Sequence, residues 1–255
     1  MASALAHPHH LQPLFWSNIN PYGTFRLDMD KRLLLPLSAL VPGPRRAAED
    51  AARPAGAVGI LFAVLLTAVI VLVRIVFPSL PPSAHEWHAN SSGREALRWA
   101  LALLPFAGIA FLWFMGALRA CVGEAEDKLV ATVFLGSGVL FVATLFALAT
   151  SAGSMLEVAA ARGGALGSGL PLWQFGHHVT YTLLSSYCMR MAAVFTLSAT
   201  TIGRLLGLFP RWLVWLGYLV GLILLFVVVN VRWSELVFPF WGLLVSCHML
   251  ISPTS

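Results

Sequence analysis

Apolar residues form six long runs between about residue 56 and residue 251, and short polar stretches separate the runs. Each run holds roughly 20 residues, the length of helix that crosses a hydrocarbon layer about 30 Å thick. The runs cover residues 56–77, 97–118, 129–150, 179–203, 212–231 and 233–251. In lipid, backbone groups must find hydrogen-bond partners within their own segment, so runs of this length form helices. The pattern therefore predicts an all-α fold, a polytopic bundle of six transmembrane helices.

The first part of the chain has a different pattern. Residues 1–54 show no sustained apolar period and include a histidine cluster and a short charged stretch before the first run. Such a composition is typical of a segment without a packed core. We therefore expect a disordered or membrane-surface tail over residues 1–54 and a six-helix transmembrane domain over residues 55–252.

Basic residues beside the predicted spans indicate the direction of the helices. With the N-terminus inside, the inner side collects Arg45, Arg46, Arg53, Arg119, Lys128, Arg204 and Arg211, and the outer side Arg74, Arg94, Arg98, Arg162 and Arg232. Short loops on the cytoplasmic side normally carry the excess of basic residues. Both termini are therefore predicted to be cytoplasmic.

Composition supports a membrane protein whose partner is the lipid bilayer. Hydrophobic residues make up 58% of the chain and charged residues 11%, against about 25% charged residues in ordinary soluble domains. The net charge of +5 does not indicate nucleic acid, because the basic residues form no stripe interleaved with aromatic residues. Arginine far outnumbers lysine and alanine is abundant. This usage favours a bacterial source, and hence a multi-pass protein of the bacterial inner membrane.

Three stretches of the chain resemble a family of uncharacterised bacterial integral membrane proteins. They are residues 106–114 (FAGIAFLWF), 131–138 (ATVFLGSG) and 189–195 (MRMAAVF). The resemblance extends over roughly residues 56–251 and excludes the tail. It implies that Arg190 belongs to a family pattern, and it implies no activity.

Arg190 is the most informative single residue, because it lies well inside the fourth predicted span. A charge at the centre of a membrane helix costs about 2.5–3.5 kcal/mol on insertion scales, so we expect its side chain to face other helices or water. Thr182, Ser186 and Arg190 recur at every fourth position, and Tyr187 is one turn from Arg190. These residues predict a polar stripe. The nearest acidic candidates are Glu235, early in the sixth span, and Glu157, in the loop after the third span, and Arg190 would approach Glu235 if the two helices adjoin.

The sequence favours two functions for this stripe. In the first, an outward-facing cavity binds or transports a small anionic or amphipathic molecule, since a guanidinium suits carboxylate and phosphate. Arg190 would anchor the molecule, and Tyr187, Ser186, Thr182 and Glu235 would line the cavity. In the second, the protein is an accessory or structural membrane subunit in which Arg190 locks the bundle. The chain is short for a transporter, so a homodimer is expected in the first case, with Gly217 and Gly221 as one contact surface.

A metal-dependent membrane enzyme is the third and least favoured function. His85, His88, His177 and His178 all fall on the predicted outer side, and imidazoles are common zinc and copper ligands. The segment 85–88 (HEWH) is one residue short of the spacing that places two histidines on one helical face. Solvated loop histidines explain it better, so we predict neither a catalytic residue nor a cofactor.

Overall fold

The computed structural model describes residues 44–76, 91–122, 128–161, 170–227, 231 and 233–251. All regular structure in these ranges is helical, which confirms the all-α fold class. Residues 1–43 of the predicted tail lie outside the described ranges, and residues 44–54 form the first part of a helix.

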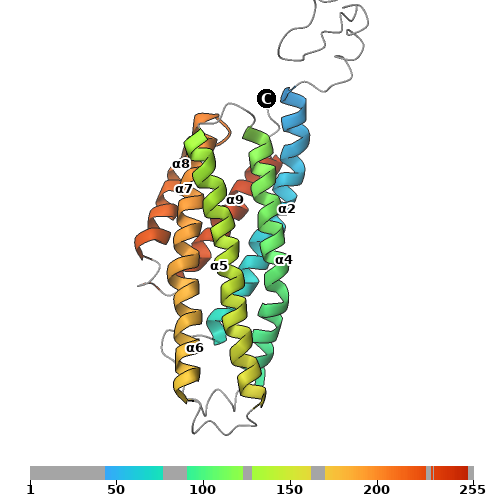
Figure 1. Cartoon of the computed structure of the whole chain (residues 1–255). Coiled ribbons are helices and arrows are strands. Elements are labelled where there is room, and N and C mark those ends of the chain that lie inside the picture. Colours follow the sequence, from blue (N-terminus) through green and yellow to red (C-terminus); the bar gives the residue numbers. More distant parts are fainter. Residues whose placement is uncertain are drawn as a thin grey trace, which may run out of the picture. The chain divides into compact units, whose positions relative to one another are not determined.

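The described helices follow one another up and down the bundle (Figure 1). In chain order they are α2 (Pro44–Val76), α4 (Ser91–Val122), α5 (Lys128–Ala161), α6 (Leu170–Thr182), α7 (Met189–Leu205), α8 (Arg211–Leu222) and α9 (Val237–Ile251). A π-helical segment, η1 (Leu183–Cys188), joins α6 to α7 without a break, and a second, η2 (Ile223–Val227), prolongs α8. A single 3₁₀ turn, η3 (Ser234–Leu236), leads into α9.

Four helices in the described part of the chain are long and apolar enough to cross a membrane. They cover Pro54–Val76, Ser92–Ala120, Lys128–Glu157 and Ser234–Ile251, and they contain nearly all of the first, second, third and sixth predicted spans. The fourth predicted span, 179–203, falls in the helix that η1 interrupts, and the fifth, 212–231, corresponds to the shorter apolar helix Arg211–Val227. The structure thus supports a helical membrane protein with four helices of membrane length.

The helices pack as antiparallel neighbours. The first helix, α2, lies against α4 and α9, while α5 lies between α4 and α7, and α8 packs on α7. Only a few residues separate α4 from α5 and α7 from α8, so the neighbouring ends of these helices lie together. Arg119, Lys128, Arg204 and Arg211 are at those ends. They form the basic end of the bundle, and the side of the membrane that this end faces stays a prediction.

Phenylalanine rings fill the centre where five helices meet. The Phe111 ring of α4 lies 5.0 Å from Phe62 of α2, 4.8 Å from Phe141 of α5 and 4.8 Å from Phe195 of α7, between ring centroids. Phe238 of α9 joins the cluster 5.2 Å from Phe141. All five side chains are fully buried. Aromatic pairs at these separations add to the free energy of burial, so the middle of the bundle is a packed core.

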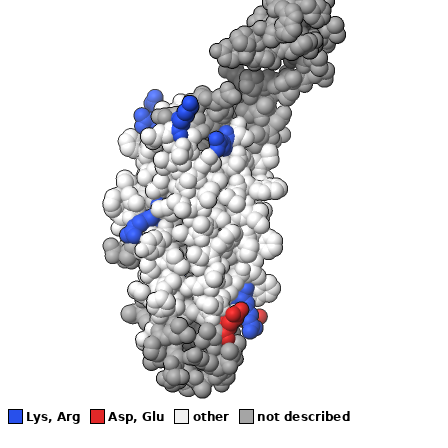
Figure 2. Space-filling model, in the orientation of Figure 1, with Lys and Arg blue, Asp and Glu red and all other residues white. Residues whose placement is uncertain are grey.

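The outside of the bundle is apolar along most of its length. Figure 2 shows basic side chains at the upper end, mixed charges at the lower end, and a broad white belt between them that a blue side chain interrupts on the left. Large apolar side chains are exposed within the described residues, among them Trp113, Trp215 and Phe226 at 69%, 75% and 68%. An apolar surface of this extent is expected where lipid is the solvent.

Candidate functional site

A buried ion pair joins the last turn of α2 to the turn that begins α9. Arg74, in the last turn of α2, donates a hydrogen bond from Nη2 to Oε1 of Glu235, in the turn before α9. Arg74 is 8% exposed and Glu235 is fully buried. The pair joins two segments that are 161 residues apart in the sequence. It therefore holds the end of α2 against the beginning of α9.

Tyr181 of α6 completes this charged site. The guanidinium carbon of Arg74 lies 5.1 Å from the centroid of the Tyr181 ring, within the range of a cation–π interaction. Arg74 Nε and Glu235 Oε2 are buried and have no hydrogen-bond partner among the described residues. Because a buried charge without its partner is costly, the three helices are coupled through this one contact.

The pairing of Glu235 corrects the sequence expectation that this carboxylate approaches Arg190. Sequence reasoning counted Arg74 only as a topological charge beside the first span. One signal could have found it: Arg74 and Glu235 are opposite charges, each placed at the predicted outer edge of a span. Spans that adjoin in space would bring such residues to the same depth. The sequence does not state which spans adjoin.

Arg190 is exposed on the surface of the bundle. Of the two surroundings expected for its side chain, the structure does not show packing against other helices, and contact with water stays a prediction. Among the described residues it has no hydrogen bond or ion pair. Tyr187 is 56% exposed, while Thr182 and Ser186 are half-buried. The predicted stripe is thus only partly assembled, and Arg190 shares its face mainly with Tyr187.

The π-helical segment η1 explains why the predicted stripe is only partly assembled. Thr182, Ser186 and Arg190 would share one face of a regular α-helix, but Leu183–Cys188 forms hydrogen bonds between residues five apart. This wider turn rotates the side chains before η1 relative to those after it. Residues three or four positions apart share one face of an α-helix, but this spacing does not hold across η1.

The predicted outer metal site is only partly within the described residues. His177 is buried and its ring lies 5.5 Å from that of Trp173, whereas His178 is exposed. Burial, and to a lesser degree the charge of His178, lower the pKa of His177 below its usual value. His85 and His88 lie outside the described residues. No group of three or more potential ligands is found within the described part, so the metal site stays a prediction.

Hydroxyl groups link α5 and α6 beside these histidines. Ser151 and Thr180 form a hydrogen bond of 2.9 Å, and the Thr180 hydroxyl lies 3.9 Å from the sulfur of Met155. Thr180 is fully buried. This contact fixes the outer halves of the two helices against each other.

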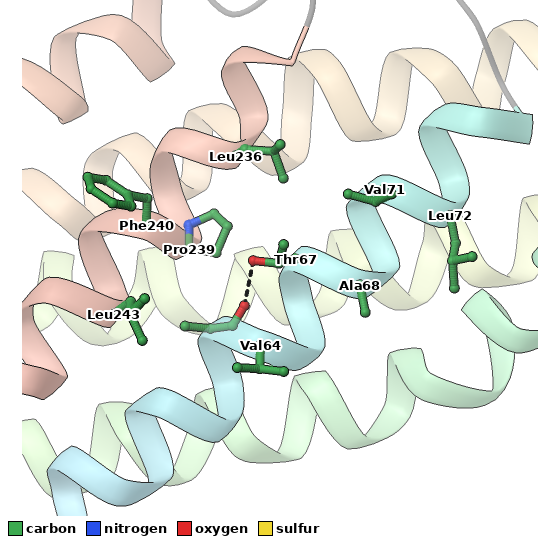
Figure 3. A pocket seen from close by; sticks show the side chains of 10 residues that line it. Val64, Thr67, Ala68, Val71, Leu72, Leu236, Pro239, Phe240 and Leu243 are labelled. Carbon is green, nitrogen blue, oxygen red and sulfur yellow. Dashed lines mark hydrogen bonds between the residues drawn. The ribbon is translucent and has the colours of Figure 1, made fainter.

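An apolar groove of about 720 Å³ runs along the surface between α2 and α9 (Figure 3). Its lining is Ala63, Val64, Thr67, Ala68, Val71, Leu72, Leu236, Pro239, Phe240 and Leu243. The Thr67 hydroxyl donates to the carbonyl of Ala63 at 2.7 Å, so the one hydroxyl in the lining is already satisfied. None of the predicted site residues contributes to this groove.

Gly217 and Gly221, predicted as a dimer contact, are buried inside the chain. A Cβ at Gly217 would collide with Thr200, and a Cβ at Gly221 with Leu197, both on α7. The two glycines allow α8 to approach α7 closely. This surface is therefore not available to a second copy, and the homodimer itself stays a prediction.

Comparisons of the chain with protein-family models, with curated proteins and with solved structures give no match. The fold and the site define the class: a helical membrane protein with a packed aromatic core and a buried ion pair between the first and last described helices. The resemblance to uncharacterised bacterial membrane proteins stays a prediction.

Proposed function

We propose that all six apolar segments cross the bilayer and that both termini face the cytoplasm. The helix through α6, η1 and α7 runs without a break over residues 170–205, about 50 Å at 1.5 Å per residue. The apolar helix Arg211–Val227 is about 25 Å long on the same basis. These lengths support six spans. The abundance of arginine over lysine, and of alanine, supports a bacterial source and hence a bacterial inner membrane.

We further propose that the protein is an accessory or structural subunit of the membrane. The observation that carries this proposal is the packed phenylalanine core. Phe62, Phe111, Phe141, Phe195 and Phe238 occupy the space at mid-bundle through which a solute would have to pass. The ion pair of Arg74 and Glu235 then has a role in architecture, joining the end of α2 to the beginning of α9.

Deletion of the gene in its native host tests this function. Quantitative proteomics of the membrane fraction should show that a small set of membrane proteins falls in abundance while their transcripts do not change. Wild-type protein should restore them, and so should the Arg190→Gln variant, whereas Arg74→Ala should not. An unchanged membrane proteome, together with an uptake defect for a solute, would overturn the proposal.

A second candidate function is the binding or transport of a small anionic or amphipathic molecule. It is favoured by the exposure of Arg190 within an apolar helix. Such a molecule would reach the guanidinium from the bilayer side of the bundle. Uptake or ligand binding that is lost in Arg190→Gln at unchanged membrane abundance would establish this function in place of the first.

A further inference from the structure

The hairpin of α8 and α9 is shorter than its neighbours. As far as they are described, Arg211–Val227 and Ser234–Ile251 extend about 25 Å and 27 Å along the helix axis, at the lower limit for crossing the roughly 30 Å of an average hydrocarbon layer. By the same measure α4 and α5 are about 50 Å long. Figure 1 shows α8 and α9 ending partway along the bundle while α5 and α6 continue. The described residues on either side of the turn, Val227 and Trp233, therefore lie closer to the basic end than the far ends of the long helices do.

Glycine contacts show which part of α7 lies at the depth of this turn. Gly217 packs on Thr200 and Gly221 packs on Leu197. Because α7 and α8 are antiparallel, each step forward along α8 corresponds to a step back along α7. Continued to the end of η2, this register places Val227 at about the level of Arg190. The exposed guanidinium thus lies where the hairpin ends.

The surface at this level has the composition of a membrane interface. Tyr187, Phe226 and Trp233 are exposed at 56%, 68% and 39%. Tyrosine and tryptophan are enriched where hydrocarbon meets headgroups. Arg190 lies about 20 Å along α7 from Arg204 at the basic end, which is too deep for an interface of ordinary thickness.

A bilayer can adapt to an arginine at this depth. An arginine side chain extends toward the nearest headgroups, and the bilayer thins locally when this lowers the cost of burying the charge. A helix shorter than the hydrocarbon thickness causes thinning as well, at a cost of fractions of a kcal/mol per Å. The short hairpin and the exposed arginine favour the same deformation at the same depth.

We infer that the surface formed by Arg190, Tyr187 and the end of η2 binds phospholipid headgroups of a locally thinned outer leaflet. The ligand is the phosphate of a membrane lipid, which a guanidinium binds through paired, charge-assisted hydrogen bonds. The phenol of Tyr187 is placed to contact the same headgroup layer. This inference rests on the six-span topology proposed above and not on the role as a subunit.

Spin labels at matched depths test the thinning directly. Phe226 lies at the thinned face, and Phe106, 61% exposed on α4, lies about 20 Å from Arg119 and so at a comparable distance from the basic end. Phe226→Cys and Phe106→Cys would be labelled in a background without the three native cysteines. In phosphatidylcholine vesicles, a water-soluble nickel relaxant should reach label 226 and not label 106. Equal accessibility of the two labels would overturn the inference.

Bilayer thickness provides a second test with the full chain. In phosphatidylcholine vesicles with acyl chains of about 14, 18 and 22 carbons, wild-type protein should unfold at the highest temperature in the thinnest bilayer. Arg190→Leu should move this optimum toward thicker bilayers, and Arg190→Lys should keep it. The matched variant Arg204→Leu, at the basic end, should also keep it. An optimum unchanged in Arg190→Leu would contradict a role for the guanidinium.

Binding of free phosphate can be distinguished from binding of lipid phosphate in a maltoside detergent, because this detergent contains no phosphorus. Added inorganic phosphate should leave the unfolding temperature of the wild type unchanged. Stabilisation of the wild type and not of Arg190→Leu would identify a site for soluble phosphate and overturn the lipid assignment. An error in the proposed six-span topology would be detected separately, by labelling residues at the two ends of the bundle.

Discussion

Arg74 and Glu235 couple three helices through a single buried contact where the end of α2 meets the beginning of α9. Two opposite charges in a region of low dielectric attract strongly, but each has lost its hydration. The net gain of such a pair is therefore small, whereas the loss of one partner is severe. The contact therefore adds little to the free energy of unfolding. Its main effect is to determine which helices pack against each other.

The first prediction concerns this pair. Arg74→Ala should lower the free energy of unfolding by about 3–5 kcal/mol, because it leaves Glu235 buried and unpaired. The double variant Arg74→Met, Glu235→Leu should recover most of that loss. Thermal unfolding in detergent measures both effects, with the exposed Arg98→Ala as control. Equal stability of Arg74→Ala and Arg98→Ala would contradict the proposed coupling.

His177 gives the second prediction, which concerns pH. Its pKa is lowered by burial from the usual 6.5, so the folded state binds fewer protons than the unfolded state. The contribution of His177 to the free energy of unfolding is fully present above pH 6.5 and declines as the pH falls below that value. The unfolding temperature should therefore drop on acidification, and His177→Asn should reduce the drop.

His178 provides the matched control for that experiment, because it is adjacent and exposed. His178→Gln should change the pH dependence much less than His177→Asn does. A pH profile that is the same in wild type and His177→Asn would show that other groups cause the acid sensitivity.

At the scale of helices, the close approach of α7 and α8 depends on two glycines of α8. Gly217 faces Thr200 and the indole nitrogen of Trp241, and Gly221 faces Leu197. This approach sets the register that brings the end of η2 to the level of Arg190. The sequence spacing of the glycines correctly indicated a packing surface, but it did not identify the partner.

The third prediction follows from this contact. Gly217→Ala should lower the free energy of unfolding by about 1–3 kcal/mol, because the added methyl group overpacks the interface. Gly116→Ala on α4 is the control, since its Cβ meets open space, and it should be neutral or stabilising by up to about 1 kcal/mol. Similar effects of the two substitutions on the unfolding temperature would contradict the close packing of α7 and α8.

The position of η1 is the part of the helix arrangement that sequence reasoning missed. Leu183–Cys188 contains leucine, serine, tyrosine and cysteine, and each of these is compatible with an α-helix. A π-helical turn depends on how neighbouring helices accommodate the extra residue, which the local sequence does not encode. The expected stripe of Thr182, Ser186 and Arg190 failed for this reason.

At the scale of the whole molecule, the arrangement of charges defines two ends and an apolar belt. The belt is wide enough for a bilayer along α4 and α5, and Arg204 and Glu157 are exposed at its opposite ends. Six spans would place Arg204 in the cytoplasm and Glu157 outside.

The fourth prediction tests this topology. In intact cells without native cysteines, a membrane-impermeant maleimide should label Glu157→Cys and should not label Arg204→Cys. Labelling of Arg204→Cys should appear once the membrane is permeabilised. The reverse result would invert the orientation, and labelling of both in intact cells would exclude an odd number of spans between them, and with it the proposed single span.

The sequence by itself determined that the fold is helical and where the main membrane helices lie. This is because the length of an apolar run and the internal hydrogen bonding of a helix are local properties. It also located Arg190 within a membrane segment, since one charge in an apolar run is visible without neighbours.

Only the tertiary structure decided which charges meet and which faces are covered. Arg74 and Glu235 are separated by 161 residues, so their contact depends on α2 and α9 lying side by side. The exposure of Arg190 depends on which face of α7 the other helices leave uncovered, and the burial of Gly217 depends on α7. These are relations between distant segments, and the pattern along one segment contains no record of its neighbours.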